Sequence, residues 1–404
     1  MVTTTEHTSF ITQSKRMLAY WQETTVHIDL ATMALLEAER HNLFHAVQIG
    51  LRIPDCGEET AVILSQAIPF IAQRGYWQEW QPLLQMCLAQ QQFQKQTTQI
   101  DLLISLGRTY RLNSQFDEAI KTHQAAKQLA QKNGTQQQCG TALHDLLEDY
   151  FFVRQYQKAE EVGLAALEIL ESIADAEQLL ANCYKMLGSV FFASQKQTEA
   201  EEMFTHAVSM WRQLQHPVHL ARTLNDLSLL LHAQQRYDAA EACLLEAASL
   251  LNSTINELDK CMVQINLGMI YSTQQQWGRA ENALRQANSP FLRQSVELPR
   301  KARVNNNLGY VLFRQNRYTE ADEYLREALT YWQEIGDDLE YANSLSSLAD
   351  CLHAQGNRAE ALPLYDQLLL LLAQYPTHPY AQSLQAEYTA VRQNVQDEKE
   401  AANP

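Results

Sequence analysis

A small residue returns along most of this sequence at intervals of 40 or 41 residues. Five of the seven positions carry an aromatic residue three places earlier, and six carry Gly, Ser or Ala twelve places earlier. The repeated residues are Ala119, Ala159, Ala200, Ala240, Ala280, Ala321 and Ala361. A fixed period of this length indicates a chain built from stacked copies of one supersecondary unit.

Each copy predicts a pair of antiparallel helices. In residues 303–335, Leu308 and Leu312 share one face of the first helix, and Ala321 and Leu325 begin a stripe on the second. The short segment 315–317 between them predicts a turn. Small residues let two helix backbones approach closely, and stacking of neighbouring pairs then buries a continuous core.

Three short motifs make the repeat specific. They are Leu-Gly-x-x-Tyr at Leu267–Tyr271, aromatic-x-x-Ala at Trp277–Ala280, and a second small or apolar residue seven places after each alanine. The pattern resembles the tetratricopeptide repeat (TPR) family over residues 98–375, in seven copies. The period is longer than the usual 34 residues and is similar to the kinesin-light-chain type. HEAT repeats share this period, but the order glycine, aromatic, alanine is not typical of them.

The resemblance implies an all-α fold. It is a right-handed α-α superhelix, or TPR solenoid, with a helical N-terminal cap region and a C-terminal capping helix. The predicted segments are a disordered N-terminus (1–13), a helical region with one degenerate repeat (14–95), seven repeats (96–375), a capping helix (376–395) and a disordered tail (396–404).

The N-terminal region is also similar to the entry of the TPR sensor arm in STAND-class regulatory ATPases. A Glu-x-x-Asn-Leu-x-x-Ala helix is common there, and Glu39, Asn42, Leu43 and Ala46 match it. The sequence contains no G-x-x-x-x-G-K-[ST] motif, so it predicts no loop that could cradle phosphates. The resemblance therefore implies a sensor arm without its ATPase.

Charge and composition exclude several classes of protein. With 31 Lys and Arg against 47 Asp and Glu, the net charge of −16 argues against direct binding of nucleic acid, which depends on neutralising phosphates. The longest apolar run, Leu368–Ala373, is far too short to span a bilayer. No signal peptide is visible, and the seven cysteines form no C-x-x-C pair. We therefore expect a soluble, cytoplasmic protein with no membrane partner, of undetermined oligomeric state.

Candidate chemical groups are few. Glu37, His41 and His45 share one predicted helix face with ligand-like spacing, and His216 and His219 flank a proline in a predicted turn. Asp145, Glu148 and Asp149 could in principle perform acid–base chemistry, but carboxylates on such helices are usually solvated. No nucleophile elbow or H-E-x-x-H motif occurs. We expect no enzyme activity, no metal site and no cofactor.

The TPR resemblance instead implies a binding groove, lined by the first helix of each pair. Its lining carries more basic than acidic residues, asparagines that can bond peptide amides, and a methionine-rich floor. The predicted groove residues are Arg108, Arg111, Lys185, Arg222, Asn225, His232, Met262, Met269, Arg303, Asn306, Tyr310 and Asn343. The predicted partner is a protein or peptide, acidic or carboxylate-bearing, with an apolar anchor.

Two function classes remain open. The first is a non-enzymatic interaction scaffold, regulatory or signalling, that binds a peptide or a partner helix in the groove. The alternative is a peptide-responsive regulator of the Rap type, which the N-terminal helices before about seven repeats resemble. It would act on a response regulator through residues 14–93. A hydrolase would need a catalytic group in those residues, and no convincing constellation occurs there.

Overall fold

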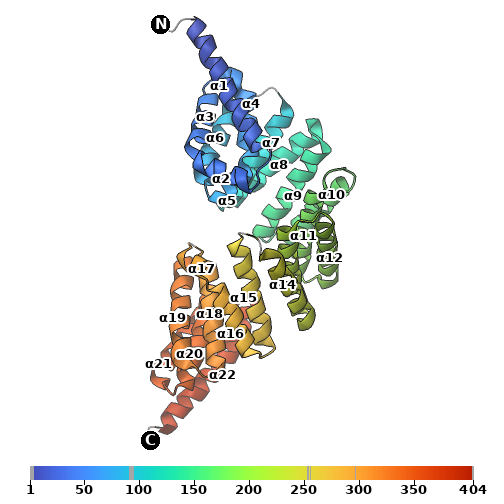
Figure 1. The fold of residues 1–404 in the computed structure, drawn as a ribbon. Helices are drawn as coiled ribbons and strands as arrows, with labels where there is room; N and C mark the ends of the chain where they lie inside the picture. The colour runs from blue at the N-terminus through green and yellow to red at the C-terminus, as the bar shows by residue number, and fades with distance from the viewer. Residues whose placement is uncertain (1–3, 91–94, 253, 255, 296, 403–404) are drawn as a thin grey trace. The chain divides into compact units, whose positions relative to one another are not determined.

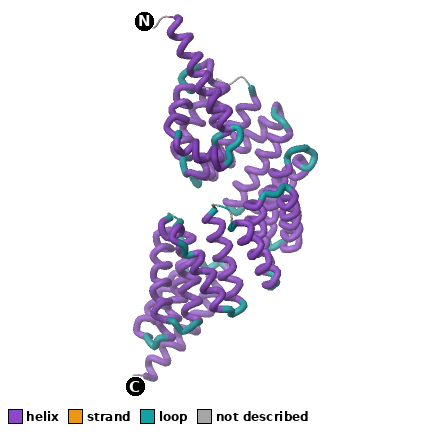
Figure 2. The backbone as a smooth tube through the Cα atoms, in the orientation of Figure 1, coloured by secondary structure: helices purple, strands orange, loops and turns teal. Residues whose placement is uncertain are grey.

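The structure is a computed structural model that describes residues 4–90, 95–252, 254, 256–295 and 297–402. Over these residues the regular structure is helical throughout, with no strand (Figure 2). The chain divides into two compact units, Met1–Leu214 and Gln215–Pro404. This division differs from the five segments predicted from the sequence, because the boundary falls between the third and fourth repeats.

The N-terminal unit begins with six helices around their own core. They are α1 (Thr4–Thr25), α2 (Leu30–Ala38), α3 (Arg40–Gly50), α4 (Gly57–Gln66), α5 (Ile68–Arg74) and α6 (Trp77–Gln90). Leu43 and Ala46, which match the STAND-like helix, are fully buried in that core, while Asn42 donates a hydrogen bond to Glu39. Trp80 is also fully buried and donates its indole N–H to the Leu64 carbonyl.

Three helical hairpins complete this unit. They are α7 (Gln96–Leu112) with α8 (Phe116–Asn133), α9 (Gln136–Phe152) with α10 (Tyr156–Leu170), and α11 (Glu177–Ala193) with α12 (Gln197–Gln213). Helix α4 packs against α7, which joins the hairpins to the six-helix core.

The C-terminal unit holds four more hairpins and a terminal helix (Figure 1). They are α13 (Pro217–Ala233) with α14 (Tyr237–Leu251), α15 (Glu257–Thr273) with α16 (Trp277–Ala287), α18 (Leu298–Arg314) with α19 (Tyr318–Ile335), and α20 (Asp338–Ala354) with α21 (Arg358–Leu372). The short α17 (Pro290–Gln294) lies between α16 and α18, and α22 (Pro379–Ala402) packs on α21 and α20.

The sequence period and the packing agree closely. All seven repeated alanines are fully buried. The glycine of the first helix in a pair accommodates a large side chain sixteen residues later. A Cβ built at Gly268 would lie 2.5 Å from Leu284 Cγ, and one at Gly309 would lie 2.5 Å from Leu325 Cγ. The predicted close crossing of the two helices is therefore present.

The turn inside each hairpin also repeats. In every one of the seven pairs, a residue at the turn has a left-handed backbone conformation with φ between 58° and 82°. These residues are Ser114, Arg154, Gln195, Gln235, Gln275, Asn316 and Gly356. The turn directs the second helix back along the first.

The two ends differ from the predicted disordered segments. Helix α1 begins at Thr4, and α22 continues through Ala402, while residues 1–3 and 403–404 lie outside the described residues. A physical reason for the longer α22 is that the Glu398 carboxylate accepts hydrogen bonds from His353 and Arg358, at 3.1 and 3.0 Å. The sequence places Glu398 in the predicted disordered tail, because a run of charged residues is usually solvated.

Candidate functional site

The C-terminal unit contains a cavity of about 470 Å³, which is lined by α22 and by the first helix of each of three hairpins, α15, α18 and α20. We call it the C-terminal cavity. Residues three or four apart on α15, α18 and α20 face it together, and α22 supplies the remaining wall. It is lined by Met269, Ser272, Thr273, Asn306, Asn307, Tyr310, Phe313, Asn343, Ser346, Ser347, Asp350, Tyr380, Ser383, Leu384, Glu387 and Tyr388.

Four of the predicted groove residues meet in this cavity: Met269, Asn306, Tyr310 and Asn343. Asn306 is 7% exposed, and its Oδ1 is buried without a hydrogen-bond partner in the described part of the chain. A buried amide oxygen that lacks a partner loses its hydration without compensation, which costs about 1–3 kcal/mol. A bound donor would remove this cost.

Asp350 lies at the wall of the cavity between α20 and α22. Its two oxygens accept hydrogen bonds from the hydroxyls of Tyr365, at 2.7 Å, and Tyr388, at 2.8 Å. Burial raises the pKa of this carboxyl, although both tyrosine hydrogen bonds act in the opposite direction. The TPR resemblance implies Asp350 among the lining of the first helices, at the position equivalent to Tyr310 and Met269, although the predicted groove residues do not include it. Glu387 and Tyr388 were not predicted to line the groove, because α22 lacks the repeat signature.

Three other predicted residues in this unit bond to neighbouring repeats. Arg222 on α13 forms an ion pair with Asp259, with a shortest separation of 2.9 Å. Asn225 accepts a hydrogen bond from Asn266 at 2.8 Å. The ring of His232 lies 3.0 Å from the Thr273 hydroxyl, and burial lowers its pKa. These groups connect the first helices α13 and α15 to one another.

The remaining two predicted groove residues of this unit are Met262 and Arg303. Met262 is half-buried on α15. Arg303 is exposed on α18, and it forms no hydrogen bond or ion pair with the residues that the structure describes.

In the N-terminal unit, the two predicted arginines belong to a buried ionic network. Arg108 binds the Asp145 carboxylate through two nitrogens, and Arg111 binds Asp145, Glu148 and Asp149 at 2.6–2.9 Å. Asp145 and Asp149 are at most 1% exposed. Burial alone raises the pKa of the Asp145 carboxyl, but Arg108, His123 and Arg111 together hold it below its usual range.

His123 extends this network into the helix crossing. Its ring occupies the space beside Gly107 that a leucine or phenylalanine fills in other repeats, and a Cβ at Gly107 would lie 2.3 Å from it. Nδ1 lies 2.5 Å from an Asp149 oxygen and Nε2 lies 3.1 Å from the Ile104 carbonyl. Both neighbours are acceptors, so both bonds form only when both ring nitrogens carry hydrogen. The sequence analysis missed this residue.

Lys185, the third predicted residue in this unit, is half-buried on α11. It lies on a different repeat from Arg108 and Arg111. The structure thus gathers two of the three predicted cations into one network, with carboxylates of the same chain as their partners.

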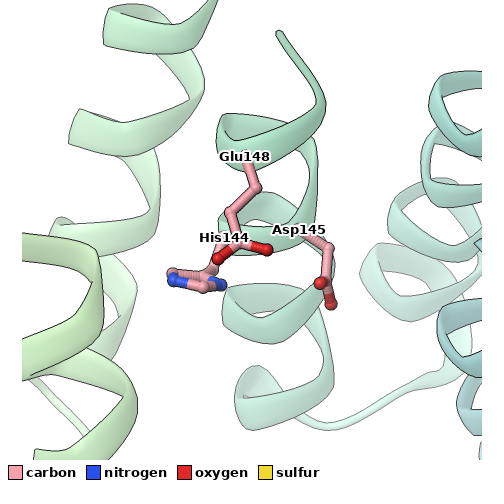
Figure 3. A group of neighbouring side chains, drawn as sticks. All are labelled: His144, Asp145 and Glu148. Carbon is pink, nitrogen blue, oxygen red and sulfur yellow. The ribbon is translucent and has the colours of Figure 1, made fainter. Parts of the chain in front are cut away.

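One cluster in the described residues has metal-ligand composition: His144, Asp145 and Glu148 on α9, with ligand atoms within 4.8 Å of one another (Figure 3). Both nitrogens of His144 are buried without a hydrogen-bond partner in the part of the chain that the structure describes, and burial is the main cause that lowers the pKa of His144. However, Asp145 and Glu148 already bind arginine, and the adjacent guanidinium charges oppose a second cation. The cluster does not fit a metal ion.

The other residues with ligand-like spacing in the sequence contact groups of their own chain or lie exposed. Glu37 accepts a hydrogen bond from the Tyr76 hydroxyl and forms an ion pair with Arg74. His41 and His45 are exposed. His216 and His219 contact each other edge to face, with ring centres 4.4 Å apart.

A search of known families and structures agrees with this architecture. A tetratricopeptide repeat family model matches residues 98–172, 219–287 and 300–373, which is more than half of the chain. The chain therefore belongs to the tetratricopeptide repeat family. No curated protein sequence matches it.

Several solved structures share the fold at low sequence identity. The apo form of the quorum sensor NprR from B. thuringiensis has a TM-score of 0.58 and 14% identity, covering 88% of this chain and 98% of that one. A Rap protein complexed with Competence and Sporulation Factor has a TM-score of 0.55 and 12% identity, covering 84% and 98%. A STAND protein with a TPR sensor from Pyrococcus horikoshii has a TM-score of 0.57 and 12% identity. That match covers 88% of this chain, which spans half of the STAND protein.

Within the described residues, no helix combines the length and apolar character needed to cross a bilayer. That finding concerns the helices alone, and it agrees with the short apolar runs of the sequence.

Proposed function

We propose that this chain is a non-enzymatic, cytoplasmic interaction scaffold with a regulatory or signalling role, whose C-terminal cavity binds an extended peptide segment of a partner. The observation that carries the proposal is the side-chain oxygen of Asn306, which is buried without a hydrogen-bond donor among the described residues and belongs to a cavity lined by two further asparagines. TPR proteins commonly act through protein and peptide partners, which supports it.

The lining suits a peptide backbone. Asn306, Asn307 and Asn343 each offer one amide donor pair and one acceptor, which is the complement of a peptide group. Ser346 and Ser347, which also line the cavity, donate their hydroxyls to the backbone carbonyl of Asn343. Met269, Phe313 and Leu384 supply apolar surface for an anchoring side chain.

A binding role rather than a catalytic one is supported by the state of the acidic groups. Asp145, Glu148 and Asp149 are all engaged by Arg111, and Asp149 also binds His123. A general base must be able to reach a substrate proton, and carboxylates held in this way are committed to structure.

The acidic partner predicted from the sequence depends on free cations in the groove. Arg108, Arg111 and Arg222 bind carboxylates of their own chain, so this preference rests on Arg303. Arg303 lies one turn before Asn306 and Asn307 on the same face of α18.

The proposal is tested by peptide binding to the full chain. We expect immobilised pools of short acetylated and amidated peptides to retain the wild type, and Asn306→Leu to weaken binding about tenfold, because it removes two or more amide bonds. The matched control is Asn282→Leu, the same change at an exposed site on α16. Equal binding by wild type and Asn306→Leu would contradict the proposal.

A second candidate is a ligand-responsive regulator of the Rap type. It is favoured by the match to NprR and Rap, which extends over 84–88% of this chain and so includes part of its N-terminal helices. In that case a chain lacking residues 1–95 should still bind peptide but lose its effect on a response regulator. Loss of peptide binding by the shortened chain would exclude this candidate.

A further inference from the structure

The ionisable carboxyl groups that line the C-terminal cavity are not accompanied by a cationic lining residue. Its lining contains two ionisable carboxyls, Asp350 and Glu387, and no lysine, arginine or histidine. Asp350 and Glu387 are close enough that the charge of Glu387 raises the pKa of Asp350. A hollow lined by like charges attracts the opposite charge and repels its own.

Neither carboxylate is paired with a cation in the described residues. Asp350 bonds to two tyrosine hydroxyls, and Glu387 is exposed with no hydrogen-bond or ion-pair partner in that part of the chain. Carboxylates elsewhere in the unit do have cationic partners, such as Asp259 with Arg222 and Glu398 with Arg358. Partly buried charges are usually paired, so Asp350, the partly buried one of the two, lacks a cationic counterpart among the described residues.

Uncharged groups of the lining favour the same ligand. The Asn306 oxygen is a buried acceptor that receives no hydrogen bond from any described residue. Tyr310, Tyr380 and Tyr388 present aromatic rings, whose faces attract ammonium and guanidinium groups. Tyr310 already shows this preference, because the guanidinium of Arg314 lies 5.7 Å from its ring centre and donates to its hydroxyl at 2.8 Å.

We propose that the C-terminal cavity recognises a lysine or arginine side chain of the bound peptide, with Asp350 and Glu387 as its counter-charges and Asn306 as an additional acceptor. This inference rests on the proposed peptide binding and specifies its chemistry. It assigns α22 a recognition role, because Glu387, Tyr380 and Tyr388 all lie on that helix. It also reverses, at this cavity, the acidic preference predicted from the sequence.

The experiment compares peptide pools that differ at one central position, with uncharged flanks and blocked termini, by fluorescence polarisation on the full chain. The central residue is arginine, lysine, glutamine or glutamate. We expect the arginine and lysine pools to bind about tenfold more tightly than the glutamine pool, as a charge-assisted bond predicts, and the glutamate pool to bind most weakly.

Two variants locate the preference. Asp350→Asn should remove most of the preference for arginine and lysine, and Glu387→Gln, at an exposed site, should reduce it by about two- to fivefold. Glu323→Gln is the control, because it removes the same charge from an exposed site on α19 outside the cavity. If Asp350→Asn fails to fold, Glu387→Gln still decides the question.

The outcomes separate the inference from the function on which it rests. If no pool binds, the proposed peptide binding fails. If all pools bind equally, or if the variants leave the preference unchanged, peptide binding stands and the cation site is overturned. Preferential binding of the glutamate pool that is lost in Arg303→Glu would support the acidic partner and contradict the inference.

Discussion

The carboxylate of Asp145 shows how strongly a single residue can shape this chain. The sequence suggested that Arg108 and Arg111 face a ligand, but the carboxylate of Asp145, 37 and 34 residues later, binds both guanidinium groups. The placement of Arg108 and Arg111 in a binding groove stays a prediction. Their carboxylate partner was not foreseen, because a repeat pattern does not report which polar groups bond to the next repeat.

We predict that Asp145→Asn destabilises the N-terminal unit by about 3–5 kcal/mol at pH 7, because it removes the buried carboxylate that binds both Arg108 and Arg111. The folded-state pKa of Asp145 is depressed, so its contribution is present above the unfolded pKa, about 4, and falls as the pH falls below it. The difference from wild type should therefore narrow in acid. Urea unfolding of wild type and Asp145→Asn at pH 7 and at pH 3 measures this difference in the free energy of unfolding.

The control for this experiment is Glu161→Gln, an exposed carboxylate on α10. It should change the free energy of unfolding by less than about 0.5 kcal/mol. A difference between wild type and Asp145→Asn that stays constant from pH 7 to pH 3 would show that the ion pairs are not the cause.

At the scale of the helical element, Gly268 tests the close crossing of α15 and α16. A leucine there would overlap Leu284, so we predict that Gly268→Leu lowers the free energy of unfolding by about 1–3 kcal/mol. Gly278 on α16 has no atom within 4 Å of a built Cβ, so Gly278→Ala should be neutral or stabilising, by up to about 1 kcal/mol. Chemical denaturation of both variants checks the pair, and equal melting of Gly268→Leu and wild type would contradict it.

The repeated elements were predictable from the sequence, and the cavity was not. The buried alanines and glycines mark each crossing, because packing leaves no room for larger residues there. Four residues of the lining, Met269, Asn306, Tyr310 and Asn343, are among the groove residues that the TPR resemblance implied, and their role in binding stays a prediction. Tyr380, Glu387 and Tyr388 did not, because α22 has no repeat motif and its register against α20 is set by tertiary packing.

At the scale of the whole chain, the division after Leu214 predicts that each compact unit folds on its own. We predict that residues 1–214 and residues 215–404, expressed separately, each fold with helical circular dichroism and a cooperative melt, since contacts in repeat proteins are mainly between neighbours. A fragment that is unfolded alone but helical in the full chain would contradict this prediction. Splitting within a hairpin, for example after Gln235, serves as the unfavourable control.

The hairpin turns have a consequence for how such a chain can change. Six of the seven place a residue with a side chain in the left-handed conformation, at a cost of roughly 1–2 kcal/mol each relative to an ordinary backbone. None of these turn residues lines the C-terminal cavity. Glycine substitutions at these turn positions would relieve backbone strain without altering the cavity lining. The thermal stability of the chain and the proposed peptide specificity could therefore change independently during evolution.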